Sequence, residues 1–220
     1  MSYQHVIEVL GLDQHETYSK YRTVPYIKQW FDFANEMASS EDTLLFLIFY
    51  YCIFEGTWFP TAFAAIYSLH RRNLMTGTGQ QIQYIHRDET QHISFGIKLI
   101  EEGMVELGMR PTTDEVHALF REAMKHLDDW ADYCIPVVLG YSAELHKQHA
   151  RYLADRRLRL LGYPKLFDAE EVLPWLDEMA SIRKEKNFFE SRVTEYQSAA
   201  GLKFDESDSI EDLVNWRVNA

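Results

Sequence analysis

The sequence predicts an all-α protein, and three observations support this fold class. The chain has 220 residues, of which 46% are hydrophobic and only 10 are glycine and 6 proline, so it has enough apolar surface for one packed domain. Signals that start and stop helices follow one another along most of the chain. No run of strand length alternates apolar and polar residues. We therefore expect a helical bundle.

The first two helices are predicted from their start signals. Val24 to Met37 carries Pro25 at its first helical position, where the missing N–H of proline costs nothing. Ser40 is followed by two acidic residues, a pattern typical of an N-cap, and opens an apolar helix that we expect to reach Asn73. The segment Thr76 to Gly79 contains two glycines and is expected to interrupt the helical structure.

Two long helices follow in the prediction. The first covers Gln80 to Leu107 and ends before a glycine. Thr112 and Glu115 have the spacing of a capping box and open the second, which we expect to reach Cys134. Pro136 interrupts the pattern there.

The last predicted helices are less regular. Val138 to Leu161 is expected to end at Gly162, with a proline two residues beyond it. Asp168 to Met179 and Ser181 to Thr194 are expected to form two further short helices.

Charge and cysteine content exclude some classes of partner. The chain has 22 basic and 34 acidic side chains and a net charge of −12, whereas binding to a phosphate backbone requires a basic surface. We expect no nucleic-acid partner. Cys52 and Cys134 lack the spacing of a metal or redox motif, which is typical of reduced thiols in a cytoplasmic protein.

The stretch from Leu44 to Leu69 is apolar enough to raise the possibility of a membrane span, since Glu55 is its only charged residue. A helix buried inside a bundle has the same composition. An acidic residue at mid-length, together with Gly56 and Pro60, would make a poor lipid-facing surface. We expect a core helix and no membrane.

The chain changes character at about Gly201. Residues 201–220 are rich in acidic side chains and poor in apolar ones, which indicates a flexible acidic tail. Leu213 and Trp216 stand near its end. We interpret them as anchors for a groove on a partner, and the alternative is a disordered end that carries stray apolar residues.

The candidate site lies on two long predicted helices. Glu89 and His92 share a face with Ile82 and Gly96, a stripe that otherwise predicts core. Glu55 interrupts the apolar face of the preceding helix in the same way. Charged groups that point inward are costly unless they are paired or bind a metal, so this pattern predicts a metal site in the bundle core. The alternatives are a solvated helix face and a hydrogen-bonded core histidine.

Other pairs of histidine and acid lie on amphipathic helices among lysines and arginines. These are Glu122 with His126, and Glu144 with His146 and His149. Exposed charge pairs of this kind are weak evidence for function, and we expect these residues at the surface.

Several short runs resemble the small, radical-generating subunit of class I ribonucleotide reductase. Glu55-Gly-Thr-Trp-Phe59, with Phe63 four residues on, and Arg87-Asp88-Glu89-Thr-Gln-His92 are similar to its two C-terminal metal-ligand helices. The other similar runs are Ser2-Tyr3, His5-Val6-Ile7, Lys186-Asn-Phe-Phe-Glu190, Arg192-Val-Thr-Glu-Tyr196-Gln and Glu211-Asp-Leu-Val-Asn-Trp216. These runs lie in the family's order along the whole chain.

The resemblance implies a ferritin-like helical bundle, incomplete at its N-terminus, over residues 1–200. It implies that residues 201–220 dock on the large, or alpha, subunit of the reductase. Glu55, Glu89 and His92 would be ligands of a dinuclear iron centre, with manganese as the alternative metal. Reaction of that centre with dioxygen would oxidise Tyr3 to a tyrosyl radical.

The resemblance also implies roles for neighbouring residues. Asp88 would hydrogen-bond around the ligands, and Tyr196 would pass the oxidising equivalent to the large subunit, which reduces ribonucleoside diphosphates. The apolar pocket around the radical would contain Phe59, Phe63 and Ile85. The small subunit would act in the cytoplasm as a homodimer.

The sequence departs from the family at its beginning. The family pattern has six metal ligands, and this sequence matches the last three. The other three would come from a separate chain that supplies the upstream helices, unless the reading frame is truncated. Two other functions stay open: a ferritin-like oxidase or metal-storage protein, and a catalytically inactive fragment that only binds the large subunit.

Overall fold

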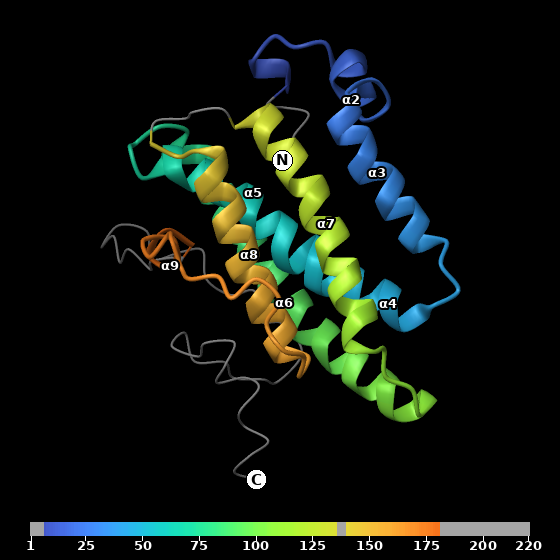
Figure 1. Ribbon diagram of the computed structural model, residues 1–220. Helices are drawn as coiled ribbons and strands as arrows, with labels where there is room; N and C mark the ends of the chain where they lie inside the picture. Colours follow the sequence, from blue (N-terminus) through green and yellow to red (C-terminus); the bar gives the residue numbers. More distant parts are fainter. Residues whose placement is uncertain (1–6, 136–139, 181–220) are drawn as a thin grey trace, which may run out of the picture.

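The all-α prediction is confirmed by a computed structural model of the chain, which describes residues 7–135 and 140–180 (Figure 1). Its helices pack as a bundle in which α6 lies beside η1 and α5, while α8 lies beside α7 and η1. Their bounds are α2 Gln14–Thr23, α3 Pro25–Ala38, α4 Thr43–Leu47, η1 Ile48–Trp58, α5 Phe59–His70, α6 Thr76–Leu107, α7 Thr113–Cys134, α8 Ala143–Leu160 and α9 Leu176–Ala180.

The apolar stripes of these helices meet in two clusters. The larger one lies between α3, η1, α6, α7 and α8, and it contains the buried Trp58, whose ring stacks on Trp30 at 4.3 Å between centroids. The smaller one joins α5 and α6 to α9 around Tyr67. Together they fix η1, the helix that carries Glu55, between α6 on one side and α8 on the other.

The predicted helix from Ser40 to Asn73 is present but differs in its start and its winding. Asp42, not Ser40, caps it by accepting a 2.9 Å hydrogen bond from the backbone N–H of Leu45. Its middle third, η1, is a π-helix, a wider winding that is rare and is often found at functional sites.

Gly56 shows why the sequence tolerates the wide winding at this point. A Cβ at Gly56 would lie 2.7 Å from the carbonyl oxygen of Tyr51, so a larger residue would clash with the π-helical backbone. The hydroxyl of Thr57 donates a 2.7 Å hydrogen bond to the carbonyl of Cys52, five residues earlier. The missing side chain at Gly56 and this hydrogen bond together fit the wide turn that presents Glu55.

The predicted break at Thr76 to Gly79 is wrong, because these residues form the first turn of α6. The chain turns instead between His70 and Thr76, where Asn73 and Met75 adopt positive φ angles of 60° and 51°. Gly79 is needed for packing, since a Cβ at that position would clash with the ring of His70.

The capping box of Thr112 and Glu115 is confirmed at the start of α7. The next predicted helix begins later than expected, at Ala143, because Ser142 caps it there. Of the stretch Asp168 to Met179, only the end is helical in α9; Pro174 disfavours helical geometry for the residue before it.

Helix α2 was not predicted, because it buries no side chain and therefore has no apolar stripe to detect. The expected helix from Ser181 to Thr194 and the expected tail lie outside the described residues.

One helical run in the described part of the chain, Thr43–His70, is long and apolar enough to cross a membrane. Within its most apolar window 56% is buried by the rest of the bundle. It is a core helix of this fold, as the sequence predicted.

Candidate metal site

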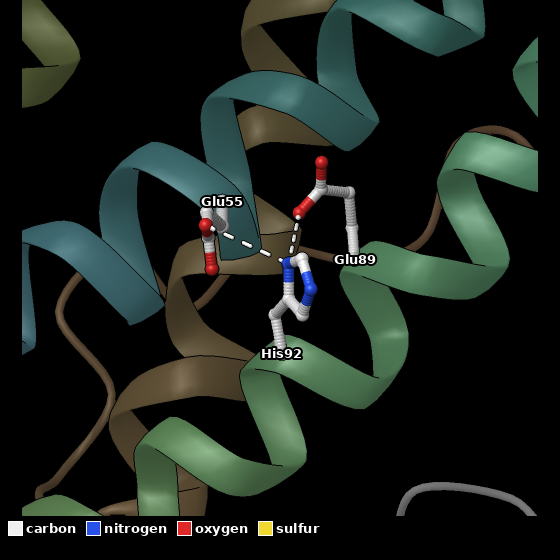
Figure 2. Close-up of side chains that lie close together, drawn as sticks. All are labelled: Glu55, Glu89 and His92. Atoms are coloured by element: carbon white, nitrogen blue, oxygen red, sulfur yellow. Dashed lines mark hydrogen bonds and ion pairs between the residues drawn. The ribbon is translucent and has the colours of Figure 1, made fainter. Parts of the chain in front are cut away.

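The structure brings Glu55, Glu89 and His92 together. Glu55 projects from η1 toward α6, where Glu89 and His92 lie one turn apart (Figure 2). The imidazole Nδ1 of His92 lies 3.1 Å from Oε2 of Glu89 and 3.7 Å from Oε1 of Glu55. Each residue offers one possible ligand atom, and these three atoms all lie within 4.8 Å of one another.

The two carboxylates are buried, with 6% exposure for Glu55 and 8% for Glu89. Oε2 of Glu55 has no hydrogen-bond partner among the described residues, which is costly for a buried charge. Burial raises the pKa of Glu55, and the charge of Glu89 raises it further; a hydrogen bond from Tyr50 and the nearby His92 oppose that rise.

His92 is placed differently from the prediction that it points inward, because 55% of its side chain is exposed. It lies at the edge of the pair of helices, on the side of α6 that no other described helix covers. The group is thus closed on the Glu55 and Glu89 side and open on the His92 side.

The residues present fit a metal ion. Carboxylate and imidazole are the donors that iron, manganese and zinc accept in helical bundles. A bound cation would offset the charge of the unpartnered Glu55 oxygen and of the second carboxylate beside it. Three protein ligands leave further coordination positions open to other side chains or water.

Apolar side chains follow Glu55 along its helix. Phe59 is half-buried, its ring centroid 4.7 Å from Phe54, and Phe63 is buried one turn further on. Ile85 on α6 packs in the same cluster as both.

Asp88 is exposed, and among the described residues it makes no hydrogen bond to His92. The imidazole Nδ1 instead contacts Glu89. Tyr3, Tyr196, Leu213 and Trp216 lie outside the described residues.

The expectation that His146 and His149 lie at the surface is wrong, because both are buried. His146 accepts or donates a 2.9 Å hydrogen bond with the hydroxyl of Tyr141, depending on its tautomer. Burial lowers the pKa of His146 to about 4 and that of His149 to about 3. His126 pairs with Glu122 at 3.4 Å but is itself largely covered.

A buried arginine that was not predicted, Arg157 of α8, lies close to the site. Its Nε donates a 2.9 Å hydrogen bond to the carbonyl of Gly56, next to Glu55, and its Nη1 has no partner among the described residues. Burial lowers the pKa of Arg157 to about 10. No periodic signal could have found it, because it lies in a run of arginines that is typical of an exposed helix face.

Comparison with known proteins identifies the family of this chain. The family model for the ribonucleotide reductase small chain matches residues 1–174. The chain is 37% identical over 221 residues to the ribonucleoside-diphosphate reductase subunit beta of Chlamydia pneumoniae, covering 92% of this chain and 64% of that protein. It is 30% identical over 193 residues to the small chain of Trypanosoma brucei brucei, covering 87% of this chain and 56% of that one.

The fold is similar to that of a putative class I ribonucleotide reductase from Bacillus halodurans, with a TM-score of 0.72 and 24% identity over 81% of this chain and 69% of that one. The chain spans less than two thirds of the length of the two relatives compared by sequence. The match to the family model nevertheless covers most of this chain. The chain therefore belongs to the ribonucleotide reductase small chain family.

Proposed function

We propose that this chain supplies part of the dinuclear iron centre, or a manganese one, of a ribonucleoside-diphosphate reductase small subunit. The observation that supports this most directly is the convergence of Glu55, Glu89 and His92, with an unpartnered buried carboxylate oxygen among them. Family membership makes the reductase the setting in which such a group would be used.

When bound, the metal centre would supply the oxidising power to generate a radical with dioxygen. The chain's own residues would do the rest. Glu55 and Glu89 bring two negative charges into a nearly dry site and so favour cations there. Phe59 and Phe63 keep water and solutes from the reacting side chain.

The tyrosine that we propose to be oxidised is Tyr3. Tyr196 would pass the oxidising equivalent onward to a large subunit, on which the ribonucleotide is reduced, and Leu213 and Trp216 would dock the tail on that subunit. The net charge of −12 makes a basic groove on the large subunit a suitable partner. We place the reaction in the cytoplasm.

The test is to add ferrous iron anaerobically to the chain, measure binding by calorimetry, admit air and record an electron paramagnetic resonance spectrum. We expect iron binding that is lost in Glu89→Gln. The chain alone offers three of the family's six ligands, so we expect a tyrosyl signal only after a polypeptide that supplies the upstream helices is added, and Tyr3→Phe should remove that signal. Tyr18→Phe, which removes a half-exposed phenol from α2, is the matched control and should keep the signal. A radical that survives Tyr3→Phe would contradict the assignment.

A chain that binds no iron under any of these conditions would favour the inactive fragment that only docks on the large subunit. A chain that binds iron and oxidises it without any tyrosyl signal, also after the upstream polypeptide is added, would favour a ferritin-like oxidase or storage protein. The experiment therefore separates the three functions by metal content and by radical content.

A further inference from the structure

A buried arginine of α8 bonds to the turn that carries Glu55. Arg157 is only 4% exposed, and its Nε donates a 2.9 Å hydrogen bond to the carbonyl of Gly56. Gly56 directly follows Glu55 in η1, so the bond links α8 to the backbone beside a candidate ligand. The two bonded residues are 101 positions apart in the sequence, so only the folded bundle brings them together.

The backbone of this turn lacks a donor that an ordinary α-helix would have. In an α-helix the carbonyl of residue 56 accepts a hydrogen bond from the N–H of residue 60, but Pro60 has no N–H. The winding also changes here, since the N–H of Phe59 bonds five residues back to the carbonyl of Phe54 and α5 then begins. Arg157 therefore supplies a donor to the Gly56 carbonyl where the π-helix gives way to an α-helix.

The contacts around Gly56 are close on two sides. A Cβ at this position would lie 2.7 Å from the carbonyl oxygen of Tyr51 and 3.1 Å from Nε of Arg157, so a side chain would push against both. Glycine also has the greatest freedom to change its backbone angles. A donor bonded to the Gly56 carbonyl limits that freedom, and it thereby limits movement of the neighbouring Glu55.

Packing alone would not require a charged side chain at position 157. Burial lowers the pKa of Arg157 to about 10, so the guanidinium is still charged at neutral pH although its surroundings disfavour the charge. An apolar side chain would fill the same space without the cost of burying a charge. Placement of the turn beside a candidate ligand explains the buried arginine better than packing does.

We propose that Arg157 is a positioning residue of the metal site, which holds the Gly56 carbonyl and thereby fixes the direction of Glu55. This inference rests on the proposed metal-binding role of Glu55, Glu89 and His92. Residues that orient metal ligands without touching the metal commonly change its affinity by about 10–100-fold when they are replaced. Loss of the bond from Arg157 should therefore weaken metal binding by about tenfold or more.

Two substitutions of equal length separate the hydrogen bond from the charge. In Arg157→Gln, the side-chain amide nitrogen stands the same number of bonds from the backbone as Nε of arginine, so it reaches the Gly56 carbonyl as a donor. In Arg157→Met, a methyl group takes that place and donates nothing. Both variants remove the charge and shorten the side chain, so the amide is what differs between them.

The measurement is a titration of the full chain with Mn²⁺, in which the electron paramagnetic resonance signal of the free ion gives the unbound fraction. We expect Arg157→Gln to bind Mn²⁺ with nearly the wild-type affinity and Arg157→Met to bind it about tenfold more weakly or worse. Hydrogen exchange of the metal-free chain, followed by mass spectrometry over residues 50–61, should be faster in Arg157→Met alone.

Two further variants control for a general loss of stability. Tyr163→Phe removes a buried hydroxyl that donates a 2.7 Å hydrogen bond to the carbonyl of Pro111, outside the metal site. It loses one bond from a side chain to a backbone carbonyl, as Arg157→Met does. Urea unfolding should show that Tyr163→Phe is destabilised, whereas its Mn²⁺ affinity should equal that of the wild-type chain. Arg159→Met, at an exposed position of α8, should change neither property.

The outcomes separate this inference from the proposed function. If Arg157→Met binds Mn²⁺ as tightly as the wild-type chain, or if Arg157→Gln is weakened as much as Arg157→Met, the hydrogen bond does not position Glu55 and the inference is wrong. Equal weakening in Tyr163→Phe would leave Arg157 with a purely structural role and would overturn the inference as well. A wild-type chain that binds no Mn²⁺ would contradict the metal site itself and, with it, this inference.

Discussion

Replacing Glu55 by glutamine should stabilise the metal-free chain while it weakens metal binding. Glu55 is buried, one of its oxygens has no hydrogen-bond partner among the described residues, and its neighbour Glu89 carries the same charge. A buried polar group left without a partner costs about 1–3 kcal/mol, and a charged group costs more. Glutamine keeps the shape and removes the charge, so we expect the free energy of unfolding to rise by about 1–2 kcal/mol, or about 3–6 °C in Tm for a chain of this size.

The pH dependence has a definite sign. The pKa of Glu55 is raised in the folded chain, mainly by burial, so the folded state holds this proton more tightly than the unfolded state does. The metal-free chain should therefore lose stability as the pH rises through the folded pKa of Glu55. Glu55→Gln should lose this part of the pH dependence, because its amide does not titrate.

The assay is urea unfolding in EDTA at several pH values, repeated with Mn²⁺. The control is Glu102→Gln, which removes an exposed carboxylate from α6 and should change stability by less than about 0.5 kcal/mol. With Mn²⁺ the order of the two stabilities should reverse, since only the wild-type chain keeps all three of the residues that would bind the metal. A metal-free Glu55→Gln chain that is less stable than wild type at neutral pH would refute the reasoning.

Three further predictions concern other parts of the chain. Burial lowers the pKa of His149, so its protonation between pH 6.5 and about 3 favours the unfolded state by up to about 1.4 kcal/mol per pH unit. His149→Leu should therefore lose less stability than the wild-type chain as the pH falls through this range, which an acid titration followed by far-ultraviolet circular dichroism measures. Asp155→Ala should cost about 3 kcal/mol or more in urea unfolding, because its carboxylate accepts three backbone hydrogen bonds from the segment after α8. A peptide of the last twenty residues should compete with an intact small subunit for the large subunit, and Trp216→Ala should weaken the binding of this peptide by about 2 kcal/mol, as is typical of an aromatic anchor. A Trp216→Ala peptide that competes as well as the wild-type peptide would contradict the docking role.

Helix boundaries could be predicted where a side chain fixes them locally. Pro25 and the pair Thr112 and Glu115 start their helices as expected, because each acts within one turn of backbone. The turn after His70 could not be predicted, since it depends on left-handed backbone at Asn73, which a short sequence pattern does not specify.

The metal group could be predicted in composition but not in detail. A carboxylate on an apolar helix face signals an inward position, which holds for Glu55 and Glu89. The exposure of His92 depends on what packs against α6 from outside, and no pattern within α6 encodes that. The π-helical winding of η1 was likewise beyond prediction, because its apolar residues would suit an α-helix equally well.

The burial of His146, His149 and Arg157 could not be predicted from the sequence either. Their helix carries charged residues on most of its surface, so its pattern predicts exposure. The structure nevertheless packs this helix between η1, α5 and α7, which leaves little of it in contact with water.

The most direct test of the central claim is a crystal structure of the chain grown with ferrous iron, with diffraction data collected at the iron absorption edge. The account predicts anomalous density within about 2 Å of Glu55, Glu89 and His92 together, the usual distance for oxygen and nitrogen ligands of a divalent metal. Iron bound at other side chains, or iron-loaded crystals with no density at these three residues, would contradict it.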